Sequence, residues 1–258
     1  QEKPLSYIYI NSQYAFLNSL TYDQQKSRTF NDPISEAGTY AMFAGFHHRN
    51  GIRILTPGNN AAIPAVYACD ATAGVENNSD DGQAIANSGM SYADLSAYLD
   101  WAALRPMTEM EFEKICRGTQ TRVAGEYAWG TTEIAPINNI SAGLINDFQA
   151  NETYTPATNG VCAVAIGSLS VAFGPLKVGV FATGTSGRAS SGAAYYGVME
   201  MSGNLVERCV TTANATGTAF NGTLGDGTLT ANGDSNQATW PSPTTAVGIC
   251  FKGGDYVS

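Results

Sequence analysis

The stretch SYADLSAYLDWAALRPMTEMEFEKICRG, residues 91–118, carries the clearest structural signal in the chain, because two helix starts follow each other within it. Ser91 and Asp94 form a Ser-x-x-Asp variant of the capping box, and Thr108 and Glu111 form a Thr-x-x-Glu box. Gly118 is a natural stop for the second helix. Apolar residues recur at helical spacing after each box, namely Leu95, Tyr98, Leu99 and Ala102, then Phe112, Ile115 and Cys116. Two amphipathic helices are therefore predicted, beginning at Ser91 and Thr108.

The sequence on either side of this stretch predicts one more helix, short strands and long loops. The helix, NSQYAFLNSL (11–20), starts at an Asn/Ser cap and places Tyr14, Phe16 and Leu17 on one face. Short apolar runs bounded by Gly, Pro, Asn and Thr predict strands at 51–55, 161–166, 175–181 and 246–251. Residues 70–90 and 211–239 lack an apolar pattern and are predicted to be surface loops. This pattern predicts a single α+β domain over residues 1–258.

The composition limits the kind of partner that the chain can have. Its 13 Lys and Arg against 22 Asp and Glu give a net charge of -9, which disfavours nucleic acid. Only 14% of the residues are charged, whereas soluble domains average about 25%. Because such weakly charged surfaces are common outside the cell, we expect a secreted or cell-surface protein. No apolar run reaches the roughly 20 residues that a membrane-spanning helix needs, and the N-terminus shows no signal peptide, which was either never present or has been removed.

Four blocks of sequence, in order along the chain, carry a resemblance to a known family. They are NSQYAFLNSLTYDQQKSRT near the N-terminus; residues 91–118 with GEYAWG (125–130); PLKVGVFATG (175–184) with YYGVMEMSGNLVER (195–208); and FKGGDY (251–256). Together they resemble the formylglycine-generating enzyme family, a branch of the C-type-lectin-like fold. The resemblance implies the family's α+β variant of that fold, with few helices, short strands and long loops. The chain is most similar to secreted members from Bacteroidota.

One block contains candidate ligands for a hard cation. In MSGNLVE, Asn204 and Glu207 offer an amide and a carboxylate oxygen three residues apart, which suits Ca²⁺. The resemblance implies a structural calcium held there, and a second one near Asn139 and Ile140, which Asp147 or Asn151 would complete. The alternative for Asn204 and Glu207 is a turn residue beside a solvated acid.

The family's enzymatic chemistry is not evident in this chain. The resemblance implies that a closely spaced pair of cysteines, which binds copper, should follow the Gly253–Gly254 block, and none occurs before Ser258. Five cysteines lie far apart, and a Cys209–Cys250 disulfide is left open. His47 and His48 are adjacent, and neighbouring residues of a strand point to opposite faces, so they are not expected to share a metal. No catalytic residue is assigned.

We therefore predict a non-catalytic extracellular binding or structural module. It would display its long polar loops to a glycan or protein partner, or assemble into a surface structure. The alternative is a copper-dependent formylglycine-generating oxidase whose catalytic cysteines lie beyond Ser258. We expect the chain to continue there, although a partner strand could instead fill that place. Of the aromatic residues, Trp101, Trp129, Tyr195 and Tyr196 are expected in the core, while Trp240 is either a ligand contact or, as we favour, a loop anchor.

Overall fold

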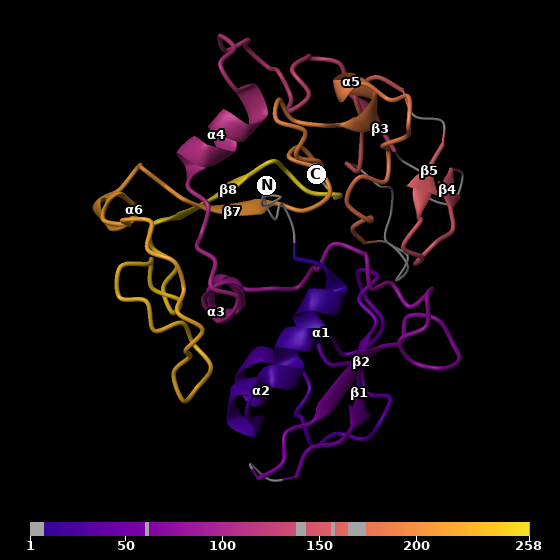
Figure 1. Cartoon of the computed structure of the whole chain (residues 1–258), viewed down its shortest axis with the longest axis vertical. Coiled ribbons are helices and arrows are strands. Elements are labelled where there is room, and N and C mark those ends of the chain that lie inside the picture. Colours follow the sequence, from indigo (N-terminus) through magenta and orange to yellow (C-terminus); the bar gives the residue numbers. More distant parts are fainter. Residues whose placement is uncertain (1–7, 60–61, 138–142, 156–157, 165–173, 258) are drawn as a thin grey trace.

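The computed structural model describes residues 8–59, 62–137, 143–155, 158–164 and 174–257. In the N-terminal half, α1 (Ile10–Ser19) and α2 (Tyr22–Arg28) lie beside the hairpin of β1 (Ile52–Thr56) and β2 (Val66–Cys69). Helices α3 (Tyr92–Trp101) and α4 (Glu109–Arg117) lead to the C-terminal half (Figure 1). The predicted α+β class, with few helices and short strands, is confirmed.

The helix starts predicted at Ser91 and Thr108 are confirmed. Ser91 and Thr108 each accept a hydrogen bond from the backbone N–H three residues on, and the carboxylates of Asp94 and Glu111 return the bond to the cap. Gly118 ends α4 with φ +62°. An added Cβ there would lie 2.1 Å from the Tyr195 ring, so close packing as well as conformation requires glycine.

The helix predicted at 11–20 is present, but its start and the helix that follows it differ from the prediction. Helix α1 begins at Ile10 after an N-cap Tyr9 that makes no side-chain cap, rather than at an Asn/Ser cap. Helix α2 was not predicted as a separate helix, although Thr21 and Gln24 form a complete capping box at its start. That signal was present in the sequence as Thr-x-x-Gln.

Among the described residues, the strands form four separate pairs. Strands β1 and β2 are antiparallel, with Ile52 opposite Cys69, and so are β7 (Glu207–Val210) and β8 (Ile249–Lys252). Two-residue strands make the other pairs, β3 (Ala135–Pro136) with β6 (Val161–Cys162), and β4 (Leu144–Ile145) with β5 (Thr153–Tyr154). The strand predicted at 51–55 is confirmed, and the run 246–251 is a strand only from Ile249. Of the run 161–166, only Val161–Cys162 is a strand among its described residues.

The strand predicted at 175–181 was wrong. This segment makes one isolated bridge, from Lys177 to Ile85, and then turns. Its apolar side chains are nevertheless buried, since Leu176, Val180 and Phe181 belong to a cluster with Ile137 and Val161. The apolar pattern therefore reported burial correctly but not the backbone conformation.

Three apolar clusters make up the core of the part of the chain that the structure describes. The largest joins α1, β1, β2 and α3 through side chains such as Phe16, Leu17 and Ile52. The second surrounds Leu176 and Phe181. The third lies under α4 and β7 and consists of Phe112, Cys116, Ala128, Ala194, Val198, Met201 and Cys209.

The aromatic residues follow the predictions only in part. Trp129 is buried and donates its indole N–H to Glu133 O, and Trp101 packs against Phe16. The prediction for Tyr195 and Tyr196 was wrong, because both are exposed, at 38% and 56%. A turn closed by the Gly197 N–H to Ala194 O bond holds the two tyrosines at the surface, and Tyr195 lies over Gly118 rather than in the core.

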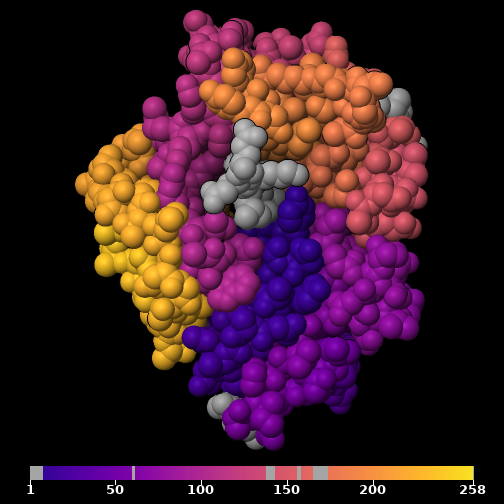
Figure 2. Space-filling view, in the orientation of Figure 1, coloured from indigo at the N-terminus to yellow at the C-terminus, as the bar shows by residue number. Residues whose placement is uncertain are grey.

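The long loop predicted at 211–239 is confirmed apart from the single turn of α6 (Ala215–Thr218). In the space-filling view the yellow C-terminal segment lies along one flank (Figure 2). Its anchor is Asp100, at the end of α3, whose buried carboxylate accepts hydrogen bonds from Asp226 N–H (2.9 Å), Asn236 N–H (3.1 Å), the Ser235 hydroxyl (2.7 Å) and Gln237 Nε2 (3.2 Å). A carboxylate on a helix thus organises a loop more than a hundred positions later in the chain.

Across the described residues, no helix has the length and apolarity that a bilayer crossing requires.

A buried ion pair connects the N-terminal half of the chain to the C-terminal half. The Arg49 guanidinium pairs with the Glu152 carboxylate, donates to Pro175 O at 2.8 Å and also reaches Asp147. Glu152 additionally accepts the backbone N–H groups of Phe148 and Lys177, both at 3.0 Å. Arg49 is 1% exposed and Glu152 is fully buried, so neither charge is solvated by water.

We predict that Glu152→Ala lowers the free energy of unfolding by about 3–5 kcal/mol, because it leaves the buried Arg49 charge with only the exposed Asp147 carboxylate as an ionic partner. Urea unfolding of the purified chain measures the loss. The matched control is Glu113→Ala, which removes the partly exposed pairs of Glu113 with Arg117 and Lys252 and should cost less than about 1 kcal/mol. Equal losses in the two variants would contradict the importance of the buried pair.

Candidate functional site

The predicted calcium ligand Asn204 is buried in the turn that leads into β7. Its backbone is left-handed, with φ +64°, and its side chain is fully buried. The amide oxygen accepts Leu176 N–H at 2.8 Å, and the amide nitrogen donates to Leu176 O at 3.2 Å. The Asn204 amide therefore acts as a bracket on the backbone of a neighbouring segment, which is the role of a strand neighbour rather than that of a solvated turn residue.

The second predicted ligand, Glu207, opens β7 and is 6% exposed. It is paired in the strand register with Lys252, and the next residue, Gly253, passes very close to its carboxylate. A Cβ added to Gly253 would lie 2.1 Å from Glu207 Oε2. Glu207 is thus a buried carboxylate rather than the solvated acid of the alternative reading.

These residues fit a calcium ion only in part. Glu207 supplies a buried carboxylate, but the Asn204 amide is already engaged with Leu176. Asn139 and Ile140, predicted for a second calcium, lie outside the described residues. Asp147, one of the residues suggested to complete that site, pairs with Arg49 instead. Within the described ranges, no three or more His, Cys, Asp or Glu side chains gather in a way that could hold a metal.

Glu200 is a buried acid that sequence reasoning did not single out. It is 1% exposed, has a left-handed backbone with φ +59°, and accepts Gly179 N–H at 3.2 Å. Burial raises the pKa of its carboxyl to about 8, although the Gly179 bond and Lys177 oppose the rise. The signal in the sequence was an acid between two methionines, in VMEM, within one of the four blocks.

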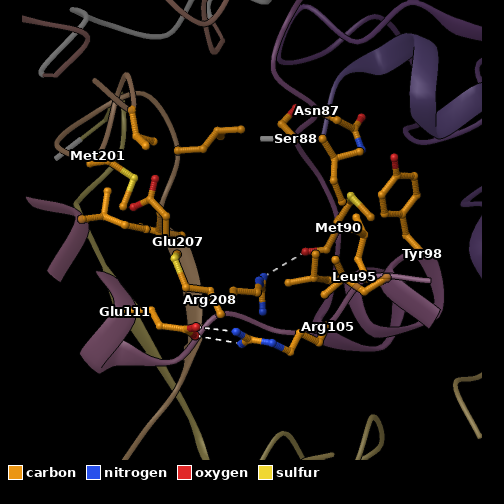
Figure 3. A pocket seen from close by; sticks show the side chains of 18 of the residues that line it. Asn87, Ser88, Met90, Leu95, Tyr98, Arg105, Glu111, Met201, Glu207 and Arg208 are labelled. Atoms are coloured by element: carbon orange, nitrogen blue, oxygen red, sulfur yellow. Dashed lines mark hydrogen bonds and ion pairs between the residues drawn. The ribbon is translucent and has the colours of Figure 1, made fainter. Parts of the chain in front are cut away.

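A cavity of about 600 Å³ lies between the two halves of the chain. In Figure 3, Asn87, Ser88, Met90, Leu95 and Tyr98 face it from one side, and Met201, Glu207 and Glu111 face it from the other. Most of the other lining side chains are apolar and come from α3, α4, the segment between these helices and the segment before β7, including Leu99, Leu104, Met107, Ile115, Val198, Leu205 and Val206.

Two arginines are among the polar residues that line the cavity. Arg208 extends from β7 and donates to Met90 O at 2.9 Å, with its guanidinium 5.1 Å from the Phe251 ring centroid. Burial lowers the pKa of Arg208. Arg105 makes a two-pronged pair with Glu111, with one bond of 2.9 Å. The Arg105 bond is the largest of the effects that lower the pKa of Glu111 to about 2.

The edge of β7 that borders the cavity is open at Arg208. Thr211 donates its N–H to Gly248 O on the β8 side, whereas Val210 donates to Met107 O on the opposite side. Alternate residues of a strand direct their backbone groups to opposite neighbours, so the Arg208 N–H and C=O point away from β8. Among the residues that the structure describes, no backbone group pairs with them.

The cysteines and histidines are arranged as structural groups. Burial raises the pKa of all five thiols, to about 12 for Cys116 and Cys162. His48 lies in a left-handed turn with φ +54°, not on a strand, and its Nδ1 is bonded to the Tyr256 hydroxyl. Trp240 is 7% exposed and donates its indole N–H to Thr223 O, which confirms the loop anchor and not the ligand contact.

We predict that Glu200→Gln stabilises the calcium-free protein at pH 8 but not at pH 4. The folded-state pKa of Glu200, about 8, exceeds the ordinary value of 4.5. Glu200 is mostly neutral at pH 4 in both the folded and the unfolded chain, whereas at pH 8 the unfolded chain is favoured because it ionises Glu200 more readily. The variant should gain about 1–3 kcal/mol at pH 8, measured by urea unfolding across pH. Glu133→Gln, at an exposed acid, is the control. A pH-independent effect of Glu200→Gln would contradict the prediction.

Comparison with known proteins identifies the family of the chain. The sequence model of the sulfatase-modifying factor enzyme 1-like domain matches residues 37–258, which is most of the chain. Searches among curated proteins and among solved structures give no significant match. The matched region includes the capped helices α3 and α4, the Asn204–Glu207 turn and the strand pair β7–β8. The chain therefore belongs to the formylglycine-generating enzyme family, whose domain is C-type-lectin-like.

Proposed function

We propose that this chain is a non-catalytic extracellular binding module. Its ligand is an extended segment of a partner protein, which carries apolar side chains and an acidic group and enters the cavity between the two halves. The observation that carries the proposal is the cavity of about 600 Å³ beside the open edge of β7.

The size and lining of the cavity support a peptide ligand. Ligand sites in proteins commonly enclose about 300–1,000 Å³ and are mostly apolar with a few polar groups. Here methionines at positions 90, 107 and 201 line the cavity together with leucine, isoleucine and valine side chains. Methionine adapts its shape to different apolar partners, which suits recognition of a protein segment better than recognition of a sugar.

The open edge of β7 supports an extended conformation for that segment. The Arg208 N–H and C=O, which face away from β8, offer one donor and one acceptor to an added strand. Strand addition obtains affinity from main-chain hydrogen bonds, and pockets for alternate side chains supply specificity. The cavity provides such a pocket beside the edge.

The charged residues that line the cavity support an acidic group on the partner segment. The whole chain carries a net charge of -9, but the cavity is lined by Arg105, Lys114 and Arg208 against the acids Glu111 and Glu207. This local excess of positive charge attracts an acidic side chain of the partner, because complementary potentials steer and orient association.

The copper-dependent oxidase is the alternative to the non-catalytic part of the proposal, and it would place its catalytic cysteines beyond Ser258. The low charged fraction of 14% supports an extracellular location. Assembly into a surface structure is a variant of the same proposal, in which the partner segment comes from another subunit.

A structural calcium at the turn before β7 is part of the proposal. Its support is the buried Glu207 carboxylate, which is an oxygen ligand of the kind that calcium prefers. Glu207 would be the charged ligand and backbone carbonyls of the turn would complete the shell. A calcium ion there would stabilise the start of β7 and, with it, the open edge.

We predict that Met107→Trp closes the cavity and abolishes peptide binding. A random peptide display library, selected against the purified chain, should enrich sequences with alternating apolar residues and an acid. Selected peptides should bind Met107→Trp at least about tenfold more weakly, a loss of roughly 1.4 kcal/mol. The matched control is Met110→Trp, three residues on, where the side chain is 62% exposed and does not line the cavity.

Two results would contradict the binding proposal. One is a library that yields no enrichment, or peptides that bind both variants equally. The other is a glycan array on which the chain binds a sugar and Met107→Trp binds it unchanged, since this would move the ligand to the polar loops.

We predict that millimolar calcium raises the melting temperature by about 5 °C at neutral pH. Glu207→Gln should remove this shift, and Glu36→Gln, at an exposed acid, should keep it. Calorimetric titration of the wild-type chain measures the stoichiometry directly. The absence of a shift, or an unchanged shift in Glu207→Gln, would contradict a calcium at this turn.

A further inference from the structure

The last strand pair places two cysteines directly opposite each other. In the antiparallel register of β7 and β8, Cys209 is paired with Cys250. Thr211 donates its N–H to Gly248 O at 2.8 Å, so positions 211 and 248 form a hydrogen-bonded pair. Because such pairs alternate along the ladder, Cys209 and Cys250 form the next one, with Cα atoms about 5.5 Å apart. Disulfides span Cα separations of about 4.4–6.8 Å.

Both thiols lie on the same face of the strand pair. Cys209 is fully buried in the cluster with Phe112 and Met201, and Cys250 packs against this cluster. Each thiol also lies within electrostatic reach of the other. Cys250 is only partly buried, and its thiol makes a weak contact with Glu109 Oε2 at 3.8 Å. An oxidant can therefore reach Cys250 first.

The other cysteines are placed differently. Cys69 belongs to the N-terminal cluster, and Cys162 lies on β6, which pairs with β3. Cys116 is the one competitor, because its side chain on α4 belongs to the same cluster as Cys209. It lies on a helix rather than in the ladder, and no register places it opposite Cys209.

We propose that Cys209 and Cys250 form a cross-strand disulfide when the protein meets a small disulfide oxidant such as glutathione disulfide. The Cys250 thiolate attacks one sulfur of the oxidant, which releases one glutathione thiolate and leaves a mixed disulfide on Cys250. The Cys209 thiolate then attacks the Cys250 sulfur and releases the second glutathione. The two protein thiols lose two electrons and two protons, and the oxidant is reduced to two glutathione molecules.

The bond would close residues 210–249 into a covalent loop and fix β8 to β7. This loop contains α6 and the polar segment that Asp100 anchors. Strand β8 makes its only described strand pairing with β7, so the disulfide would fasten an otherwise edge-placed strand. Cross-links that close long loops stabilise mainly by restricting the unfolded chain.

Incubation of the folded chain with glutathione disulfide at pH 8, followed by peptide mapping, tests the proposal. Trypsin leaves both cysteines in one peptide, 209–252, because no Lys or Arg lies between Arg208 and Lys252. That peptide should lose about 2 Da on oxidation, and chymotryptic cleavage after Phe220 should leave its two parts joined until a reductant is added. A Cys116 cross-link would instead attach the tripeptide 115–117.

Oxidation should raise the melting temperature by about 5–10 °C. Cys250→Ser, at the partly exposed position, should lose both the mass change and the shift, while Cys116→Ala should keep both. Three results would overturn the proposal: thiols that stay reduced, a glutathione adduct on Cys250 that does not resolve, or a cross-link to Cys116. The map of the wild-type chain decides between these outcomes even where a variant fails to fold.

Discussion

The buried pair of Arg49 and Glu152 is the constraint on which the arrangement of the two halves depends. The Glu152 carboxylate pairs with Arg49 and accepts the N–H groups of Phe148 and Lys177, so it closes its own turn and ties that turn to two segments that are distant in sequence. A buried charge tolerates few alternative positions, since any shift leaves it without partners. The cavity forms between the halves that this pair holds in place, and its shape therefore depends on an interaction outside its own lining.

Local signals in the sequence predicted local structure well. The capping boxes at Ser91 and Thr108 located α3 and α4, because a cap depends on residues only three positions apart. The same signal at Thr21 marked α2 and was overlooked. The segment 175–181 shows the limit of such reasoning. Its backbone at Leu176 is bonded by the Asn204 amide, so a side chain takes the place of the neighbouring strand that the apolar pattern implied.

The candidate site was predictable only in its individual residues. Asn204 and Glu207 could be chosen as a pair by their spacing, but the bracket on Leu176 and the close approach of Gly253 depend on tertiary structure. The cavity is assembled from segments near residues 8, 87–115 and 198–224, and no single segment carries a sign of it. The pairing of Cys209 with Cys250 likewise needed the register of two strands. The exposed Tyr195 and Tyr196 were misplaced because aromatic character alone does not specify burial.

The anchoring of the polar loop by Asp100 has an evolutionary consequence. The loop is held mainly through its backbone N–H groups and small polar side chains, and it contributes little to the apolar clusters. Backbone groups are the same whatever the side chain, so most positions between the anchor points can change without loss of the attachment. A helix that is itself fixed by its capping box thus carries a surface whose sequence can diversify, and related chains could present different surfaces on the same scaffold.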